Sequence, residues 1–186
     1  MRIILLGASG FVGTNIRTLL AQDRWEILAL LPRNGLRVPQ CDEVNIRWVT
    51  QAELFGPDIS PDTTIVSLAG TGNPSAFEAN PTLLEASEME IAELICKLTV
   101  AHSAKTVIYL STAGGVYGEG RSNLDGDKIF SELDNCAPIS IYGAIKFAIE
   151  KYLSTKFKSL RIDANLIIFR ATNVYGKKYN KSGTQG

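Results

Sequence analysis

Residues 2–13 of the chain read Arg-Ile-Ile-Leu-Leu-Gly-Ala-Ser-Gly-Phe-Val-Gly. After its first residue the run Arg2–Leu6 is continuously apolar, which is typical of a strand buried on both faces of a parallel sheet. Glycines at positions 7, 10 and 13 predict a tight turn, and Phe11, Ile16 and Leu19 follow with helical spacing. A strand, a glycine-rich turn and a helix in this order predict the first unit of a parallel α/β fold.

The same alternation continues along the chain. Strand patterns lie at residues 26–31, 44–49, 63–68, 106–110 and 164–169, and helical patterns at 81–101 and 141–157. Residues 111–140 are rich in Gly, Asp and Asn and are predicted to be mostly loop. Strands that alternate with helices predict a doubly wound parallel sheet, the Rossmann architecture. We expect one such domain over residues 1–176.

The composition is that of a globular protein without excess charge. Lys plus Arg and Asp plus Glu number 19 each, so the formal net charge is zero and nothing favours nucleic acid as a partner. The cysteines Cys41, Cys96 and Cys136 lack metal or redox spacing and are expected to be reduced thiols. His102 is the only histidine, so no metal site is expected. No targeting or membrane-spanning pattern is seen, which predicts a cytoplasmic location and no membrane partner.

The glycine turn is predicted to bind a dinucleotide. Its glycines allow a tight turn, a close approach of backbone to pyrophosphate, and close packing of helix on strand, while the helix start offers N–H groups to the phosphates. An ordinary turn is the alternative, but strand, turn and helix occur here in the required order. The predicted cofactor-binding residues are those of the turn and of the loop after the fourth strand: Gly7, Ser9, Gly10, Phe11, Val12, Gly13, Leu68, Ala69 and Gly70.

The end of the second strand bears on the choice of cofactor. An NAD site usually carries a carboxylate there, which accepts a hydrogen bond from the ribose 2′-hydroxyl. This chain has Leu30-Leu31-Pro32-Arg33 instead. Arg33 would suit a 2′-phosphate, although a solvated turn arginine is the plain alternative. The sequence therefore favours NADP slightly over NAD.

Tyr142 and Lys146 are four residues apart in a helical pattern, so they share one helix face. A lysine ammonium there can hydrogen-bond to the cofactor ribose, so both residues are also counted as cofactor-binding. The ammonium would also lower the pKa of the tyrosine towards neutral pH, which makes the tyrosine a usable base. Upstream, Ser111 and Thr112 end the fifth strand, where ligands bind in parallel sheets, and each is a candidate catalytic hydroxyl.

The chain resembles the extended short-chain dehydrogenase/reductases, and among them the NAD-dependent epimerase/dehydratase family. The resembling segments are Gly7–Gly13, Ser111–Gly118, Pro138–Lys146 and Phe169–Gly176. The resemblance implies that Tyr142 is the catalytic base, with Lys146 as its partner. It further implies a nucleotide-sugar substrate, an epimerase or keto-sugar reductase reaction, and a homodimer formed through residues 84–100 and 141–157. Asn173 and Tyr117 would then contact the substrate.

Several departures qualify the resemblance. The family's usual catalytic hydroxyl position is Ala113 here, so Thr112 or Ser111 must substitute. Ala113-Gly114 also replaces the Asp-Glu pair of sugar dehydratases, which argues against dehydration. A segment that often carries asparagine reads Ser87-Glu88-Met89-Glu90 here. Family members continue into a substrate-binding lobe, so residues 177–186 would be the start of a truncated region.

Two plainer expectations complete the sequence analysis. The acidic residues Glu85, Glu88, Glu90 and Glu93 have helical spacing and are expected to form a solvated face, while His102 is expected in a partly exposed loop.

A cofactor-binding Rossmann module without turnover, either regulatory or truncated, is the alternative function. The retention of both Tyr142 and Lys146 favours the enzyme.

Overall fold

The computed structural model describes residues 1–20, 22, 25–32, 45–56, 62–70, 74–118 and 129–175. Three predictions fall outside this part of the chain: the role of Arg33, the thiol of Cys41 and the character of residues 177–186. Cys96 and Cys136 are free cysteines, as expected.

Six parallel strands form one sheet. They are β1 (Arg2–Leu6), β2 (Glu26–Leu30), β3 (Ile46–Val49), β4 (Thr63–Ser67), β5 (Thr106–Thr112) and β6 (Asn165–Ala171). Their order across the sheet is β3-β2-β1-β4-β5-β6, and every neighbouring pair is parallel. The order reverses between β1 and β4, which confirms the doubly wound architecture. The carboxyl ends of β1 and β4 therefore lie side by side at the position where such folds bind ligands.

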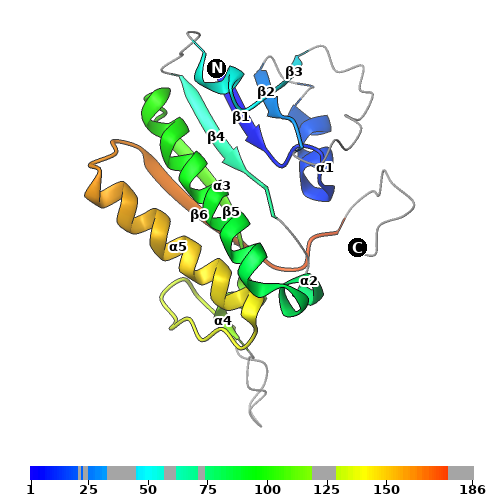
Figure 1. Ribbon diagram of the computed structural model, residues 1–186, viewed down its shortest axis with the longest axis vertical. Helices are drawn as coiled ribbons and strands as arrows, with labels where there is room; N and C mark the ends of the chain where they lie inside the picture. The colour runs from blue at the N-terminus through cyan, green and yellow to red at the C-terminus, as the bar shows by residue number, and fades with distance from the viewer. Residues whose placement is uncertain are drawn as a thin grey trace.

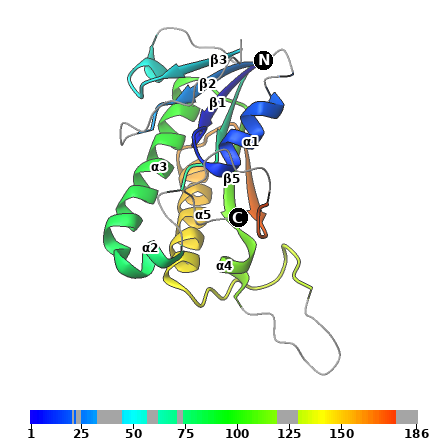
Figure 2. The same ribbon diagram turned by 90° about the vertical axis from the view of Figure 1, so that its right-hand side faces the viewer.

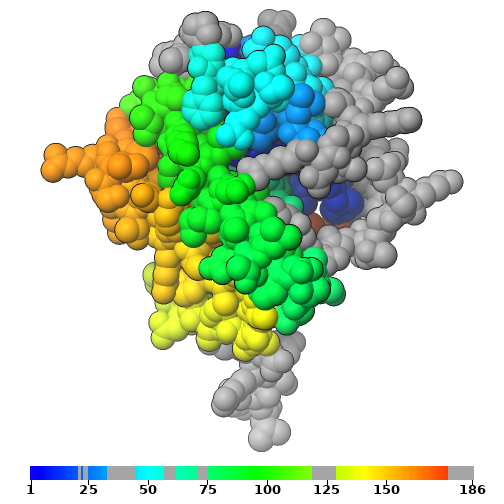
Figure 3. All heavy atoms as spheres, in the orientation of Figure 1, coloured from blue at the N-terminus to red at the C-terminus, as the bar shows by residue number. Residues whose placement is uncertain are grey.

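Helices cover both faces of the sheet (Figures 1 and 2). They are α1 (Phe11–Leu20), α2 (Pro74–Ala79), α3 (Pro81–Ala101), α4 (Ala113–Tyr117) and α5 (Ile141–Ser159), with a short 3-10 turn, η1 (Glu53–Phe55). The long helices α3 and α5 lie against one face, and α1 lies against the other. Figure 3 shows α3 and α5 as adjacent bands on the surface of the molecule.

The core follows this layering. β1 is buried along its whole length, and its side chains alternate between the two faces. Ile4 and Leu6 join Ile65, Ile95 and other residues in the larger apolar cluster beneath α3 and α5. Ile3 and Leu5 belong to a second cluster on the α1 side. The sheet edge that carries the glycine turn is thus anchored by apolar burial on both sides.

Residues 111–140 contain more regular structure than the sequence predicted. β5 continues to Thr112, and the short helix α4 follows at Ala113–Tyr117. The helix begins because the Thr112 side chain accepts a hydrogen bond from the Gly115 N–H, at 3.4 Å. α2 and η1 were not predicted either, because each is too short to show a periodic apolar pattern.

The prediction for His102 was wrong. The residue caps the carboxyl end of α3 and is buried. Its Nε2 donates a hydrogen bond to the Leu54 carbonyl oxygen at 2.7 Å, because η1 folds against α3 at this point. The histidine is therefore enclosed in the protein interior.

None of the helices in the described ranges combines the length and the apolar character needed to cross a membrane. Within the same ranges, no three His, Cys, Asp or Glu side chains gather in a way that could hold a metal ion.

Candidate cofactor and active site

The glycine turn has the geometry that its sequence predicted. Gly7 adopts a φ of +83°, in the left-handed region, and a Cβ there would lie 2.5 Å from the backbone nitrogen of Ala69. A Cβ at Gly13 would collide with the Gly7 carbonyl oxygen, so this glycine lets α1 pack against the turn. Gly10 is different, because a Cβ there would meet only the Gly7 carbonyl oxygen, at 3.4 Å. The exposed Gly10 therefore marks the open side of the turn.

A pyrophosphate group fits this turn. α1 begins at Phe11, so the N–H groups at its start lack partners one turn earlier in the helix and face the open side. No acidic side chain lies in the first turn to repel an anion. The predicted residues Ser9, Gly10, Phe11 and Val12 are all partly or fully accessible here. The turn thus combines N–H donors with the positive end of a helix dipole.

The loop after β4 joins the turn to a buried ion pair. Leu68 N–H donates to the Leu6 carbonyl oxygen at 2.9 Å, which holds this loop beside the turn. A Cβ built on Gly70 would lie 3.9 Å from both Glu88 Oε1 and Lys146 Nζ. The predicted cofactor loop therefore has a carboxylate and an ammonium directly beneath it.

The prediction that Glu88 lies on a solvated face was wrong. Its carboxylate is buried, at 1% exposure, and accepts a hydrogen bond from Lys146 Nζ at 2.8 Å. Lys146 is also buried and donates to the Tyr109 hydroxyl at 3.4 Å. Glu85 and Glu90 on the same helix are exposed as expected. The sequence signal that pointed to Glu88 was its position in the segment where the family often carries asparagine.

Tyr142 lies half-buried at the start of α5, with its ring edge against Phe77 at 5.2 Å. Burial and the nearby Glu88 carboxylate raise the pKa of Tyr142, while a side-chain hydrogen bond with Thr112 lowers it. The net direction is upward. The expected lowering of this pKa by Lys146 is therefore not seen, because Lys146 is paired with Glu88. Tyr142 is a neutral phenol at neutral pH.

The structure separates the two candidate hydroxyls. The Thr112 side chain lies beside Tyr142 and lowers its pKa. Ser111, its neighbour on β5, is buried, and its Oγ donates to Glu150 Oε1 at 2.5 Å. Glu150 and Tyr142 both lie on α5, so the two hydroxyls lie beside different parts of the same helix. Thr112 is thus placed beside the tyrosine, and Ser111 is engaged elsewhere.

The position of Tyr142 depends on two glycines. A Cβ at Gly143 would collide with the Gly115 carbonyl oxygen, so α4 and α5 begin in backbone contact. Ser140 caps α5 by accepting a hydrogen bond from the Gly143 N–H at 3.1 Å. This contact brings Tyr142, next to Gly143, to Thr112 at the start of α4.

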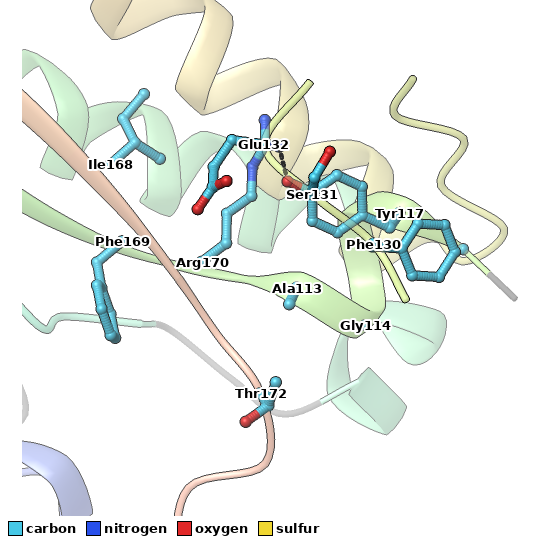
Figure 4. A pocket seen from close by; sticks show the side chains of 11 residues that line it. Ala113, Gly114, Tyr117, Phe130, Ser131, Glu132, Ile168, Phe169, Arg170 and Thr172 are labelled. Atoms are coloured by element: carbon cyan, nitrogen blue, oxygen red, sulfur yellow. Dashed lines mark hydrogen bonds between the residues drawn. The ribbon is translucent and has the colours of Figure 1, made fainter. Parts of the chain in front are cut away.

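A pocket of about 620 Å³ opens beside Ala113 and Gly114 (Figure 4). Its walls come from the start of α4, from residues 130–132 and from the end of β6. Tyr117, a predicted substrate residue, lines it, but its hydroxyl accepts a hydrogen bond from Arg170 Nη1 at 2.7 Å and its ring stacks on Phe130. Thr172 also lines the pocket, whereas Asn173, the other predicted substrate residue, is exposed and is not among the lining residues.

Arg170, which lines the pocket, forms an ion pair with Glu150. Arg170 donates to both carboxylate oxygens of Glu150, with Nη2 at 2.7 Å from Oε2. The bond to Glu150 is the main reason that the pKa of Arg170 lies above its ordinary value. This planar pairing joins β6 to α5 and, through Ser111, to β5. Sequence reasoning missed both residues, since neither stands out from its neighbours in the motifs.

A doubly wound sheet, a glycine turn at its switch point and a Tyr-x-x-x-Lys helix together define a Rossmann-fold protein of the short-chain dehydrogenase/reductase type. The model of the NAD dependent epimerase/dehydratase family matches residues 3–186. Because that match covers nearly the whole chain, the chain belongs to the NAD-dependent epimerase/dehydratase family.

Known proteins similar to this chain agree with that membership. The ADP-L-glycero-D-manno-heptose-6-epimerase of Brachyspira hyodysenteriae is 22% identical, over 97% of this chain and 57% of the relative. The UDP-glucose 4-epimerase of Thermotoga maritima, solved with UDP-glucose, superposes with a TM-score of 0.79 at 20% identity, over 100% of this chain and 60% of that one. The Thermus thermophilus UDP-glucose 4-epimerase in complex with NAD also gives 0.79, at 21% identity, over 99% and 59%. The chain thus spans about three fifths of the length of each of these proteins.

Proposed function

We propose that this chain is the cofactor-binding part of an NAD(P)-dependent enzyme that acts on a nucleotide sugar, as an epimerase or a keto-sugar reductase. One observation carries the proposal: the Thr112 side chain lies beside Tyr142, and Lys146 one helical turn away lies beneath Gly70 in the loop beside the dinucleotide turn. A base or acid, a polarising hydroxyl and a ribose-binding cation are thereby gathered at one sheet edge.

Each group has a distinct task in the proposed reaction. The turn at Gly7–Gly13 holds the pyrophosphate, and Lys146 orients the ribose by hydrogen bonding. A nicotinamide held there would supply hydride transfer to or from a sugar carbon. Tyr142 moves the proton on the oxygen of that carbon, and Thr112 hydrogen-bonds to the same oxygen. Ser111 has no contact with the reacting atoms in this scheme, because its hydroxyl is bonded to Glu150.

The protonation of Tyr142 favours one direction of the proton transfer. As a phenol it can donate a proton to a keto oxygen as hydride reaches the carbonyl carbon, which leaves an alcohol. This favours the reductive step, which an epimerase and a keto-sugar reductase share. The adjacent pocket offers both polar and apolar groups to a substrate, since Ser131 and Thr172 line it together with Phe130. The similar UDP-glucose 4-epimerase of Thermotoga maritima was solved with UDP-glucose, which supports a nucleotide sugar.

The test compares variants of the whole protein on a panel of UDP- and ADP-linked sugars. Tyr142→Phe keeps the ring but removes the proton, so turnover should fall by about a hundredfold or more while cofactor affinity stays nearly unchanged. Thr112→Ala should lose activity to a similar degree, and Ser111→Ala far less. Wild-type rates for Tyr142→Phe on a substrate that the enzyme turns over would overturn the proposed chemistry.

The second candidate function is a Rossmann module that binds cofactor without turnover. The pairing of Lys146 with Glu88 favours it, because that pairing opposes activation of Tyr142 as a base. The same panel distinguishes the candidates. Cofactor binding by calorimetry, together with no conversion of any nucleotide sugar by the whole protein, would favour the binding module.

We also propose that NADP is preferred over NAD, on the basis of Arg33 alone. Arg33→Ala should weaken NADPH binding by about tenfold or more, since a guanidinium–phosphate pair is a strong, charge-assisted bond. NADH binding should be unchanged. Arg47→Ala, which removes an exposed arginine from β3, serves as the control. Equal loss for both nucleotides in Arg33→Ala would contradict the preference.

A further inference from the structure

A buried carboxylate lies in the middle of the candidate active site. Glu88 is on α3, and the groups that face it come from three other elements: Lys146 and Tyr142 from α5, Tyr109 from β5 and Gly70 from the loop after β4. A charge buried this deeply is tolerated only when it is paired. Its 2.8 Å contact with Lys146 Nζ provides that pairing.

The Glu88–Lys146 ion pair lies close to the predicted cofactor loop. Oε1 of Glu88 lies 3.9 Å from a Cβ built on Gly70, and Lys146 Nζ lies at the same distance, while Oε2 holds the ammonium. The Tyr109 hydroxyl also accepts a hydrogen bond from the ammonium, at 3.4 Å from Nζ. Two hydrogen-bond partners, Glu88 and Tyr109, therefore hold the lysine ammonium in place.

We propose that Glu88 is a positioning residue, which fixes the Lys146 ammonium beneath Gly70 and offsets the effect of its charge on Tyr142. In a site without this carboxylate, the ammonium alone would act on the tyrosine and favour the phenolate. With it, the ammonium is paired with a carboxylate 2.8 Å away, and burial together with the Glu88 charge keeps the tyrosine protonated. This agrees with the raised pKa of Tyr142, to which burial and Glu88 both contribute.

The consequence for catalysis rests on the proposed function. Glu88 would keep Tyr142 as a proton donor in the absence of cofactor, and a ribose hydroxyl that reaches the pair could donate to the Glu88 carboxylate while it accepts from Lys146. The charge relationship itself does not depend on that function. It can be measured in the cofactor-free protein.

The experiment follows Tyr142 by NMR in protein with ring-labelled tyrosine, its signal assigned by its absence in Tyr142→Phe. In the wild type, Tyr142 should remain a phenol throughout the pH range in which the protein is folded. Glu88→Gln keeps the shape of the side chain but removes its charge, so the titration of Tyr142 should move to lower pH. Glu85→Gln removes an exposed carboxylate from the same helix and should leave Tyr142 unchanged.

A second variant covers the case in which Glu88→Gln does not fold. In E88M/K146M both charges are replaced by apolar chains of similar length, which buried ion pairs often tolerate. If the two charges offset each other, Tyr142 in this variant should titrate as in the wild type. A Glu88→Gln titration that is unchanged or moves upward would overturn the proposal, and so would a marked shift in the double variant. Loss of cofactor binding in calorimetry would count against the proposed function and leave this result standing.

Discussion

Gly115 and Gly143 meet in backbone contact where α4 and α5 begin, so that a Cβ on Gly143 would overlap the Gly115 carbonyl oxygen. The contact is close because neither residue has a side chain. It has a functional consequence, since Thr112 precedes one helix and Tyr142 begins the other. The proximity of Thr112 to Tyr142 therefore depends on how closely the two helix starts approach.

Gly143→Ala should destabilise the fold and separate Tyr142 from Thr112. Its Cβ meets backbone rather than a flexible side chain, so the free energy of unfolding should fall by about 1–3 kcal/mol, as for other overpacked sites. Gly114→Ala is the matched control, because a Cβ on Gly114 meets nothing within 4 Å. Chemical denaturation of the two variants checks this, and an equal effect of both substitutions would contradict the account of the helix contact.

Stability should fall in alkaline solution because of Tyr109. Burial, followed by the charges of Glu88 and Glu150, raises the pKa of Tyr109 above the ordinary value of 10.0. The folded state then holds this proton more tightly than the unfolded chain does. The stabilisation is fully present below pH 10.0 and is lost as the pH rises above that value.

Tyr109→Phe tests the alkaline effect. The variant loses the contact with Lys146 and should be slightly less stable at neutral pH, by about 1 kcal/mol. Above pH 10, however, its free energy of unfolding should decrease less steeply than that of the wild type. Tyr175→Phe changes an exposed tyrosine and should follow the wild type. Denaturant midpoints over a pH series provide the measurement, and parallel curves for wild type and Tyr109→Phe would refute the assignment.

The predicted homodimer remains a proposal, with α3 and α5 as its interface. Small or apolar side chains are exposed along both helices, among them Leu83 and Val100 on α3 and Ile141, Ala144 and Ala148 on α5. Such residues suit close helix packing, and the two helices form one surface in Figure 3. The interface would therefore be sensitive to a large charged side chain on α5.

Sedimentation of Ala148→Arg tests the proposed interface. The arginine should shift the protein towards the monomer, because its charge would be buried between the two copies. Leu19→Arg places the same charge at an exposed position on α1, across the sheet, and should leave the assembly unchanged. A wild-type protein that is monomeric at high concentration, or an Ala148→Arg variant that stays dimeric, would refute the interface.

The sequence was sufficient for the sheet and the glycine turn because both depend on local patterns. The apolar run predicted the buried strand β1. The spacing of Gly7, Gly10 and Gly13 predicted the tight turn that follows it. The status of Glu88 could not be predicted in this way, because burial depends on α5 packing beside α3. From helical spacing alone, Glu88 looks like its exposed neighbours Glu85 and Glu90.

The choice between Ser111 and Thr112 also needed the tertiary structure. The residues beside them, Glu150 and Tyr142, both lie on α5, and the sequence does not tell which hydroxyl lies beside which residue. The same limit explains why the direction of the pKa shift of Tyr142 was predicted wrongly. The spacing of Tyr142 and Lys146 predicted a shared helix face, whereas the partner that neutralises the lysine comes from a residue 58 positions earlier in the chain.

The central claim, that the turn at Gly7–Gly13 binds a nicotinamide dinucleotide, is tested most directly by calorimetric titration of Gly10→Ala and wild type with NADPH and NADH. A Cβ on Gly10 meets only one protein atom, at 3.4 Å, so the variant should fold normally. The same Cβ would occupy the open side of the turn, where the pyrophosphate must approach the backbone. We predict saturable binding to the wild type and a loss of at least about tenfold in affinity for a folded Gly10→Ala protein. No heat from the wild type with either nucleotide, or unchanged affinity in the variant, would contradict the claim.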